Sequence, residues 1–175
     1  MSFLKSFFYA FRGIVNCVCD ERNMRVHIVI AIYVLYFSHF YDLSITKLAL
    51  LIAVIALVLA LELVNTAIER ACDAFTKEKS PLIKFAKDVA AGAVLVSAVA
   101  SVCIGVLMFW DVQVLWSIIS SLCNSPEYLA VFILSLLVST LFIIIGPKGI
   151  VDNIHSMVEL RREMKTENEE EKHLK

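Results

Sequence analysis

The sequence contains no long basic stretch with interleaved aromatic residues, and its formal net charge is only -1. A nucleic-acid backbone is bound by a concentrated positive surface, so we exclude nucleic acid as a partner. The five cysteines include no CxxC pair, and Cys17 and Cys19 are too close together for the usual zinc spacing. We interpret all five as small, reduced, apolar residues.

A cleavable signal peptide and a glycine-rich phosphate loop are also missing. Charged and polar residues interrupt the first 25 positions before any long apolar run begins, which argues against a signal peptide. None of the five glycines belongs to a loop of the Walker or kinase type. A nucleotide site in this chain would have to be built from other groups.

Apolar residues, in contrast, are abundant. They make up 59% of the 175 residues, and the mean hydropathy is +0.79. These values are too high for an ordinary soluble domain. The composition, together with long apolar runs, predicts an all-α integral membrane protein.

The predicted elements follow from these runs. Residues 2–19 have Phe and aliphatic residues at helical spacing on one face, which predicts an amphipathic helix lying in the membrane interface. Four membrane spans are expected, at 26–41, in the first part of 45–75, at 81–110 and at 128–145. We divide the chain into a membrane core at 1–110, an interfacial connector at 111–126, an additional span at 127–146 and a charged tail at 147–175.

The most unusual stretch lies at the end of the second predicted span. Glu62, Asn65, Glu69 and Asp73 fall at i, i+3, i+7 and i+11, which places them on one side of a helix. We call these four residues the carboxylate stripe. An ionisable residue in a membrane helix costs roughly 2.5–3.5 kcal/mol on insertion scales, so the stripe calls for a functional explanation. The plainer alternatives are a helix that has already left the membrane, or carboxylates paired with basic residues.

The basic residues predict the orientation of the chain. With a cytoplasmic N-terminus and four spans, fifteen of the sixteen Lys and Arg residues lie on the cytoplasmic side, and only Lys47 lies outside. The positive-inside rule favours this arrangement. Glu21, the carboxylate stripe and the Lys87-Asp88 pair are then expected at one cytoplasmic surface. Carboxylates that bind Mg²⁺, and a lysine that neutralises phosphate, would suit phosphoryl transfer from a nucleotide to a lipid alcohol there.

Four blocks of sequence resemble the prokaryotic diacylglycerol kinase family. They are Tyr9-Ala-Phe-Arg-Gly13, Glu21-Arg-Asn-Met-Arg25, Glu62-Leu-Val-Asn-Thr-Ala-Ile-Glu69 and Ala86-Lys-Asp-Val-Ala-Ala-Gly-Ala-Val-Leu95. Their order and spacing match over about residues 1–110, and the second and fourth blocks are more similar to the undecaprenol kinase branch. The resemblance implies an ATP- and Mg²⁺-dependent kinase of undecaprenol or diacylglycerol. It also implies a homotrimer with active sites between subunits, in the bacterial inner (cytoplasmic) membrane, with both termini and the active site on the cytoplasmic side.

The resemblance also implies roles for single residues. Glu62 matches the general base that takes the proton of the lipid hydroxyl, and Glu21 and Glu69 match the Mg²⁺ ligands. The implied nucleotide-binding residues are Tyr9, Glu21, Asn65, Glu69, Glu78, Lys79, Ser80, Lys87 and Asp88.

Two features depart from the family. Ser2 stands where some members have an arginine, which puts the N-terminal lipid contact in doubt, and the fourth span and tail lie beyond the family core. Packing at the periphery of a trimer and guarding lateral access for lipid both stay open as roles for that span. A non-enzymatic transporter or assembly subunit is the alternative function, but its carboxylates should line a path across the bilayer instead of gathering on one side.

Overall fold

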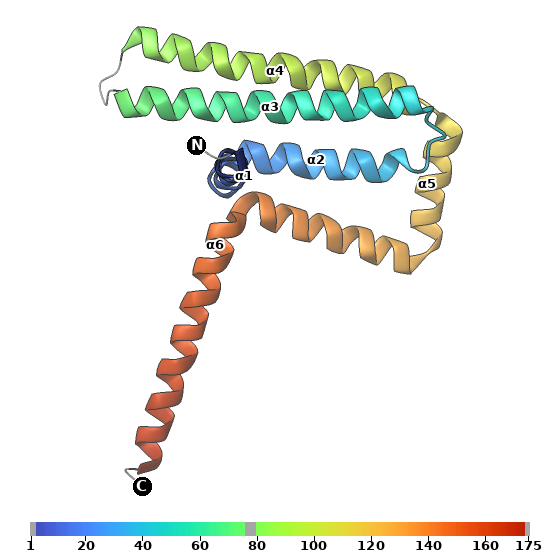
Figure 1. Cartoon of the computed structure of the whole chain (residues 1–175). Helices are drawn as coiled ribbons and strands as arrows, with labels where there is room; N and C mark the ends of the chain where they lie inside the picture. Colours follow the sequence, from blue (N-terminus) through green and yellow to red (C-terminus); the bar gives the residue numbers. More distant parts are fainter. Residues whose placement is uncertain (1–2, 76–79, 174–175) are drawn as a thin grey trace.

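The computed structural model describes residues 3–75 and 80–173, and this part of the chain is entirely helical apart from short connections (Figure 1). Its helices are α1 (Phe3–Asp20), α2 (Arg22–Ser38), α3 (Ile45–Phe75), α4 (Pro81–Phe109), α5 (Val112–Asn124) and α6 (Pro126–His173). The prediction of an all-α membrane protein is confirmed.

The two longest apolar helices, α3 and α4, run antiparallel and side by side (Figure 1). Pro81 begins α4 because its missing N–H falls in the first turn, where that group would have no partner. Ala90, Val94 and Ser97 are the buried residues of α4. Most other apolar side chains of α4 are exposed, as expected for a helix that faces lipid.

Helix α2 lies between α3 and the first half of α6 (Figure 1). It ends at Ser38, three residues before the predicted end of the first span, and contains 17 residues. Within the described residues, three segments are long and apolar enough to cross a membrane: α3, α4 and Pro126–Gly149. A membrane crossing by α2, and with it the four-span arrangement, therefore stays a prediction.

Helix α5 crosses the end of the bundle and connects α4 to α6 (Figure 1). Its N-cap is Asp111, whose carboxylate accepts hydrogen bonds from the backbone N–H groups of Gln113 (2.9 Å) and Val114 (3.2 Å). The segment predicted as an interfacial connector thus contains a short helix.

The chain bends sharply within α6. Gly146 has φ 70 and ψ 169, outside the helical region, and Pro147 follows it. Glycine adopts positive φ at little cost, and proline cannot donate the next helical hydrogen bond. The predicted end of the fourth span is found here: the helical conformation is interrupted at Gly146, and the segment after it is a second helix that leaves the bundle (Figure 1).

One end of the bundle collects the elements that carry the predicted site. The start of α2, the end of α3, the start of α4 and the bend of α6 lie together there, with α1 against them (Figure 1). Helix α5 closes the opposite end. The fold thus joins segments far apart in sequence at one level of the bundle.

Candidate functional site

The carboxylate stripe forms the inner wall of this end of the bundle. The side of α3 that bears the stripe is buried at Glu62 and Asn65, which are 3% and 6% exposed, and at Thr66 between them and Glu69. Glu69 is half-buried, and Asp73, at the last turn, is exposed. A carboxylate as buried as Glu62 is rare in proteins unless the group is used or paired.

Helix α1 covers part of the stripe. Cys17, the buried residue of α1, donates a hydrogen bond from its Sγ to the Oγ1 of Thr66 at 3.4 Å. Burial raises the pKa of the Cys17 thiol, so it remains a neutral donor. The thiol joins α1 to α3 one residue beyond Asn65.

Three carboxylates gather around the buried part of the stripe. Glu21 and Glu69 lie close enough to Glu62 for the three carboxylates to interact electrostatically. The side-chain amide of Asn65 donates to Oε1 of Glu69 at 3.0 Å. The Oδ1 atom of Asn65 is buried and accepts no hydrogen bond within the described part of the chain, which leaves an oxygen ligand free beside two carboxylates.

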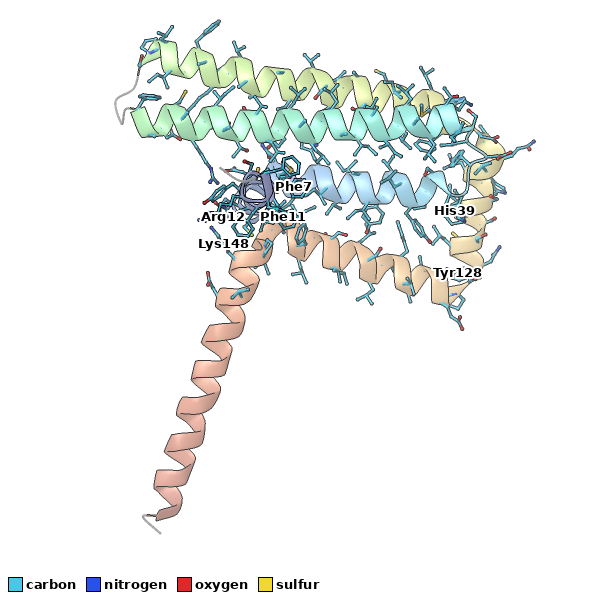
Figure 2. All side chains as sticks on the ribbon, in the orientation of Figure 1. Phe7, Phe11, Arg12, His39, Tyr128 and Lys148 are labelled. Carbon is cyan, nitrogen blue, oxygen red and sulfur yellow. The ribbon has the colours of Figure 1, made fainter. Side chains whose placement is uncertain are left out.

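Arg70 lies between two acidic residues at the end of α1. Its Nη2 is 2.8 Å from Oδ2 of Asp20 and 3.3 Å from Oε1 of Glu21. Lys148, at the bend of α6, forms a second ion pair with Asp20 through the other carboxylate oxygen. Figure 2 shows Lys148 beside α1, near the labelled Arg12 and Phe11.

Lys87 and Asp88, which are adjacent in sequence, have different surroundings in the structure. Nζ of Lys87 is 2.5 Å from Oδ1 of Asp73, so Lys87 joins the outer end of the stripe. Asp88 is exposed and forms no ion pair within residues 3–75 and 80–173. The structure thus brings Lys87, but not Asp88, to the stripe.

The weaker predicted nucleotide contacts are placed only in part. Tyr9 is exposed on α1, where its ring meets Phe8 edge to face, and Ser80 is the N-cap residue of α4. Glu78, Lys79 and Ser2 lie outside the described residues.

A metal ion would find oxygen ligands here. No cluster of three or more His, Cys, Asp or Glu able to hold a metal occurs in the described residues. The donors around Glu69 are all oxygens of carboxylates and an amide, which are the ligands that Mg²⁺ prefers. Because Mg²⁺ commonly completes its shell with water and substrate phosphates, two carboxylates and the free Asn65 oxygen fit this ion.

A cavity of about 910 Å³ lies elsewhere, between α2, α5 and α6. Aromatic and aliphatic side chains and several serines line it, and it contains no charged residue. It offers no charged group to a phosphate, whereas the stripe brings carboxylates and Lys87 together.

Four residues at the site were missed by sequence reasoning: Cys17, Asp20, Thr66 and Arg70. Thr66 and Arg70 stand four and eight positions after Glu62, next to the stripe on the same helix, so their spacing was a usable signal. Cys17 and Asp20 reach the site only through the packing of α1, which no local pattern reveals.

Comparison with known proteins gives a family match to the prokaryotic diacylglycerol kinases over residues 8–109. The undecaprenol kinase of Bacillus subtilis (strain 168) is 45% identical over 107 residues, 61% of this chain and 87% of that protein. A diacylglycerol kinase of Synechocystis sp. is 38% identical over 103 residues, 58% of this chain and 59% of its own length. The diacylglycerol kinase of Pseudomonas aeruginosa is 35% identical over 94 residues, 54% of this chain and 71% of its own.

Proposed function

This chain belongs to the prokaryotic diacylglycerol kinase family of membrane lipid kinases, and we propose that it transfers the γ-phosphate of ATP to undecaprenol or diacylglycerol. The observation that carries the choice of acceptor is the 45% identity to a protein named undecaprenol kinase, over 87% of its length. Undecaprenol is therefore the first candidate and diacylglycerol, the substrate class in the names of the other relatives, the second.

In this proposal Glu62 is the general base. It sits where the apolar run of α3 gives way to polar residues, so a lipid hydroxyl at the membrane surface can meet its carboxylate. Burial of Glu62 excludes competing water from the carboxylate. Glu62 takes the hydroxyl proton as the oxygen attacks the γ-phosphorus, and the bond from that phosphorus to the β-phosphate oxygen breaks to release ADP.

The remaining residues of the site would hold the nucleotide. Glu21 and Glu69 are the proposed ligands of Mg²⁺, with the Oδ1 atom of Asn65 beside them. The bound ion supplies positive charge to the phosphates of ATP. Lys87 adds a second cation at the outer end of the stripe. Tyr9, Asp88 and residues 78–80 are proposed as further nucleotide contacts.

The wider setting is part of the proposal. We place the protein in the bacterial inner (cytoplasmic) membrane, with both termini and the active site on the cytoplasmic side, because of the distribution of Lys and Arg. The exposed sides of α3 and α4 are compatible with a homotrimer whose active sites form between subunits. The transporter alternative is not favoured, since the charged groups lie at one end of the bundle and the relatives are named as kinases.

The test is an acceptor panel with labelled ATP and purified protein in detergent. Undecaprenol and diacylglycerol are offered separately, with Glu62→Gln as the control for background transfer. We expect labelled phosphate on undecaprenol in preference to diacylglycerol. Equal background labelling of both lipids by the wild-type protein and by the control would contradict the proposal.

A further inference from the structure

We infer that Arg25 and Lys148 are positioning residues that fasten the bend of α6 to the end of α1 and thereby hold Glu21 in place for Mg²⁺-bound ATP. This inference rests on the proposed role of Glu21 as a metal ligand. It concerns a part of the chain, Pro126–Gly149, that lies beyond the family match at residues 8–109.

Arg25 replaces a hydrogen bond that α6 lacks. In a regular helix the carbonyl of Ile143 would accept from the N–H of residue 147, but that residue is Pro147 and has no N–H. Nε of Arg25 donates to this carbonyl at 3.2 Å. An arginine of α2 thus satisfies an acceptor that the sequence of α6 leaves open.

The absence of a side chain at Gly146 leaves space for the same guanidinium. A Cβ atom at Gly146 would lie 2.9 Å from both Cζ and Nη1 of Arg25, so a side chain there would push the guanidinium out of this position. The positive φ of Gly146 independently disfavours a side chain. The bend and the arginine therefore fit each other, and Arg25 is only 6% exposed.

The same guanidinium holds the end of α1. Nη1 of Arg25 donates to the carbonyls of Val18 (3.1 Å) and Cys19 (3.0 Å), in the last turn of α1, where carbonyls lack helical partners. Glu21 follows directly and is the N-cap residue of α2, and its own carbonyl accepts from the backbone N–H of Arg25. Arg25 itself follows Glu21 in the chain, and its buried side chain bonds to two carbonyls that precede Glu21 and to one in α6. It thus links α6 to the chain on both sides of Glu21.

A series of ion pairs makes the second connection between α6 and Glu21. Lys148 pairs with Asp20, Asp20 pairs with Arg70, and Arg70 pairs with Glu21. Without Lys148, the guanidinium of Arg70 would be drawn closer to Asp20 and its distance to Glu21 would change.

The inference is tested on the full-length purified protein with Lys148→Ala, Lys148→Arg and Gly146→Ala. Lys47→Ala is the matched control, because Lys47 is exposed at the opposite end of α3 and forms no ion pair within the described residues. We measure kcat, KM for MgATP, KM for the lipid and the Mg²⁺ concentration giving half-maximal rate. Glu21→Gln is measured alongside.

We expect Lys148→Ala to raise KM for MgATP and the Mg²⁺ requirement by about two- to fivefold, the range of a partly exposed ion pair, with kcat and lipid KM nearly unchanged. Lys148→Arg should restore wild-type values, and Gly146→Ala should exceed the effect of Lys148→Ala. Wild-type nucleotide and Mg²⁺ parameters in a folded Lys148→Ala protein would overturn the inference, as would a change confined to lipid KM. If Gly146→Ala does not fold, the comparison of Lys148→Ala with Lys148→Arg decides alone. An unchanged Mg²⁺ response in Glu21→Gln would instead overturn the proposed role of Glu21.

Discussion

At the scale of single residues, the burial of Glu62 separates it from the other carboxylates. Glu62 is 3% exposed, whereas Glu21 and Glu69 are half-buried and remain accessible to an ion from solution. A base for a lipid hydroxyl and ligands for a hydrated cation need these two different environments. The two proposed roles can therefore be distinguished by substitution.

Replacing Glu62 with Gln should remove the base and leave the nucleotide site intact. We expect kcat to fall by a factor on the order of 10² to 10⁴, the usual contribution of a general base. KM for MgATP should change little, because Glu62 is not among the proposed metal ligands. Steady-state kinetics on the purified variant provide the measurement, with Glu127→Gln, an exposed carboxylate at the other end of the bundle, as the control. Loss of ATP binding at near-normal kcat would move Glu62 into the nucleotide site.

Replacing Glu21 or Glu69 with Gln should act on the metal. A neutral amide is a poor ligand for a hard cation, so each variant should need more Mg²⁺ and bind ATP more weakly while remaining folded. Rates measured over a series of Mg²⁺ concentrations, with thermal unfolding as the check on folding, show the effect. Normal Mg²⁺ dependence in both variants would rule out these two ligands.

At the scale of helices, the packing centres on the first turn of α2. Met24 is 2% exposed and is the fully buried large side chain of the described residues. It stands next to Arg25 and three residues after Glu21, where α1, α3 and α6 all approach α2. The tightest packing of the fold therefore supports the site.

Truncating Met24 to Ala should destabilise this region. A buried Met→Ala change costs about 2–5 kcal/mol, because the cavity closes only partly. We expect a clearly lower Tm for the purified protein in detergent than for Leu107→Ala, whose wild-type side chain is 81% exposed on α4. Equal Tm values for the two variants would show that Met24 is not part of a packed core.

The helices themselves could be predicted from the sequence because their signals are local. Apolar run length, Pro81 at a helix start and the 3,4 spacing of α1 gave α1, α3, α4 and α5 to within about two residues, an ordinary margin for helix ends. Residues 20–25 separate the first two predicted helices, and the structure confines this break to Glu21. The flanking Asp20 and Arg25 find partners on α3 and α6, which local propensity cannot anticipate.

At the scale of the whole molecule, the fold brings residues that are far apart in sequence to the same end of the bundle. Glu21 before α2, Glu69 on α3 and Lys87 on α4 lie near one end of the bundle. Asp88 does not join them, because its side of α4 is exposed. The attachment of α6 could not be foreseen, since it depends on a carbonyl left free by Pro147 and on an arginine 118 positions away.

The orientation of the molecule yields a labelling prediction. We expect the N-terminus, the loop at residues 76–81 and the tail after Lys148 to be cytoplasmic, because all basic residues but Lys47 would then lie inside. In intact cells, a membrane-impermeant maleimide should label the native Cys123, exposed on α5 at the opposite end, but not a cysteine introduced by Ser156→Cys. Strong labelling at position 156 from outside would contradict the four-span arrangement.

The two attachments of α6 should respond differently to ionic strength. The pairs of Asp20 with Lys148 and Arg70 are partly exposed, and mobile ions screen such charges over about 8 Å at physiological salt. The hydrogen bonds of Arg25 are buried and uncharged at the acceptor, so salt scarcely reaches them. Raising the salt concentration should therefore weaken the ion pairs that link Lys148 to Glu21, while the hydrogen bonds of Arg25 keep α6 in position. The ionic composition of the cell would then set how strongly α6 influences the site.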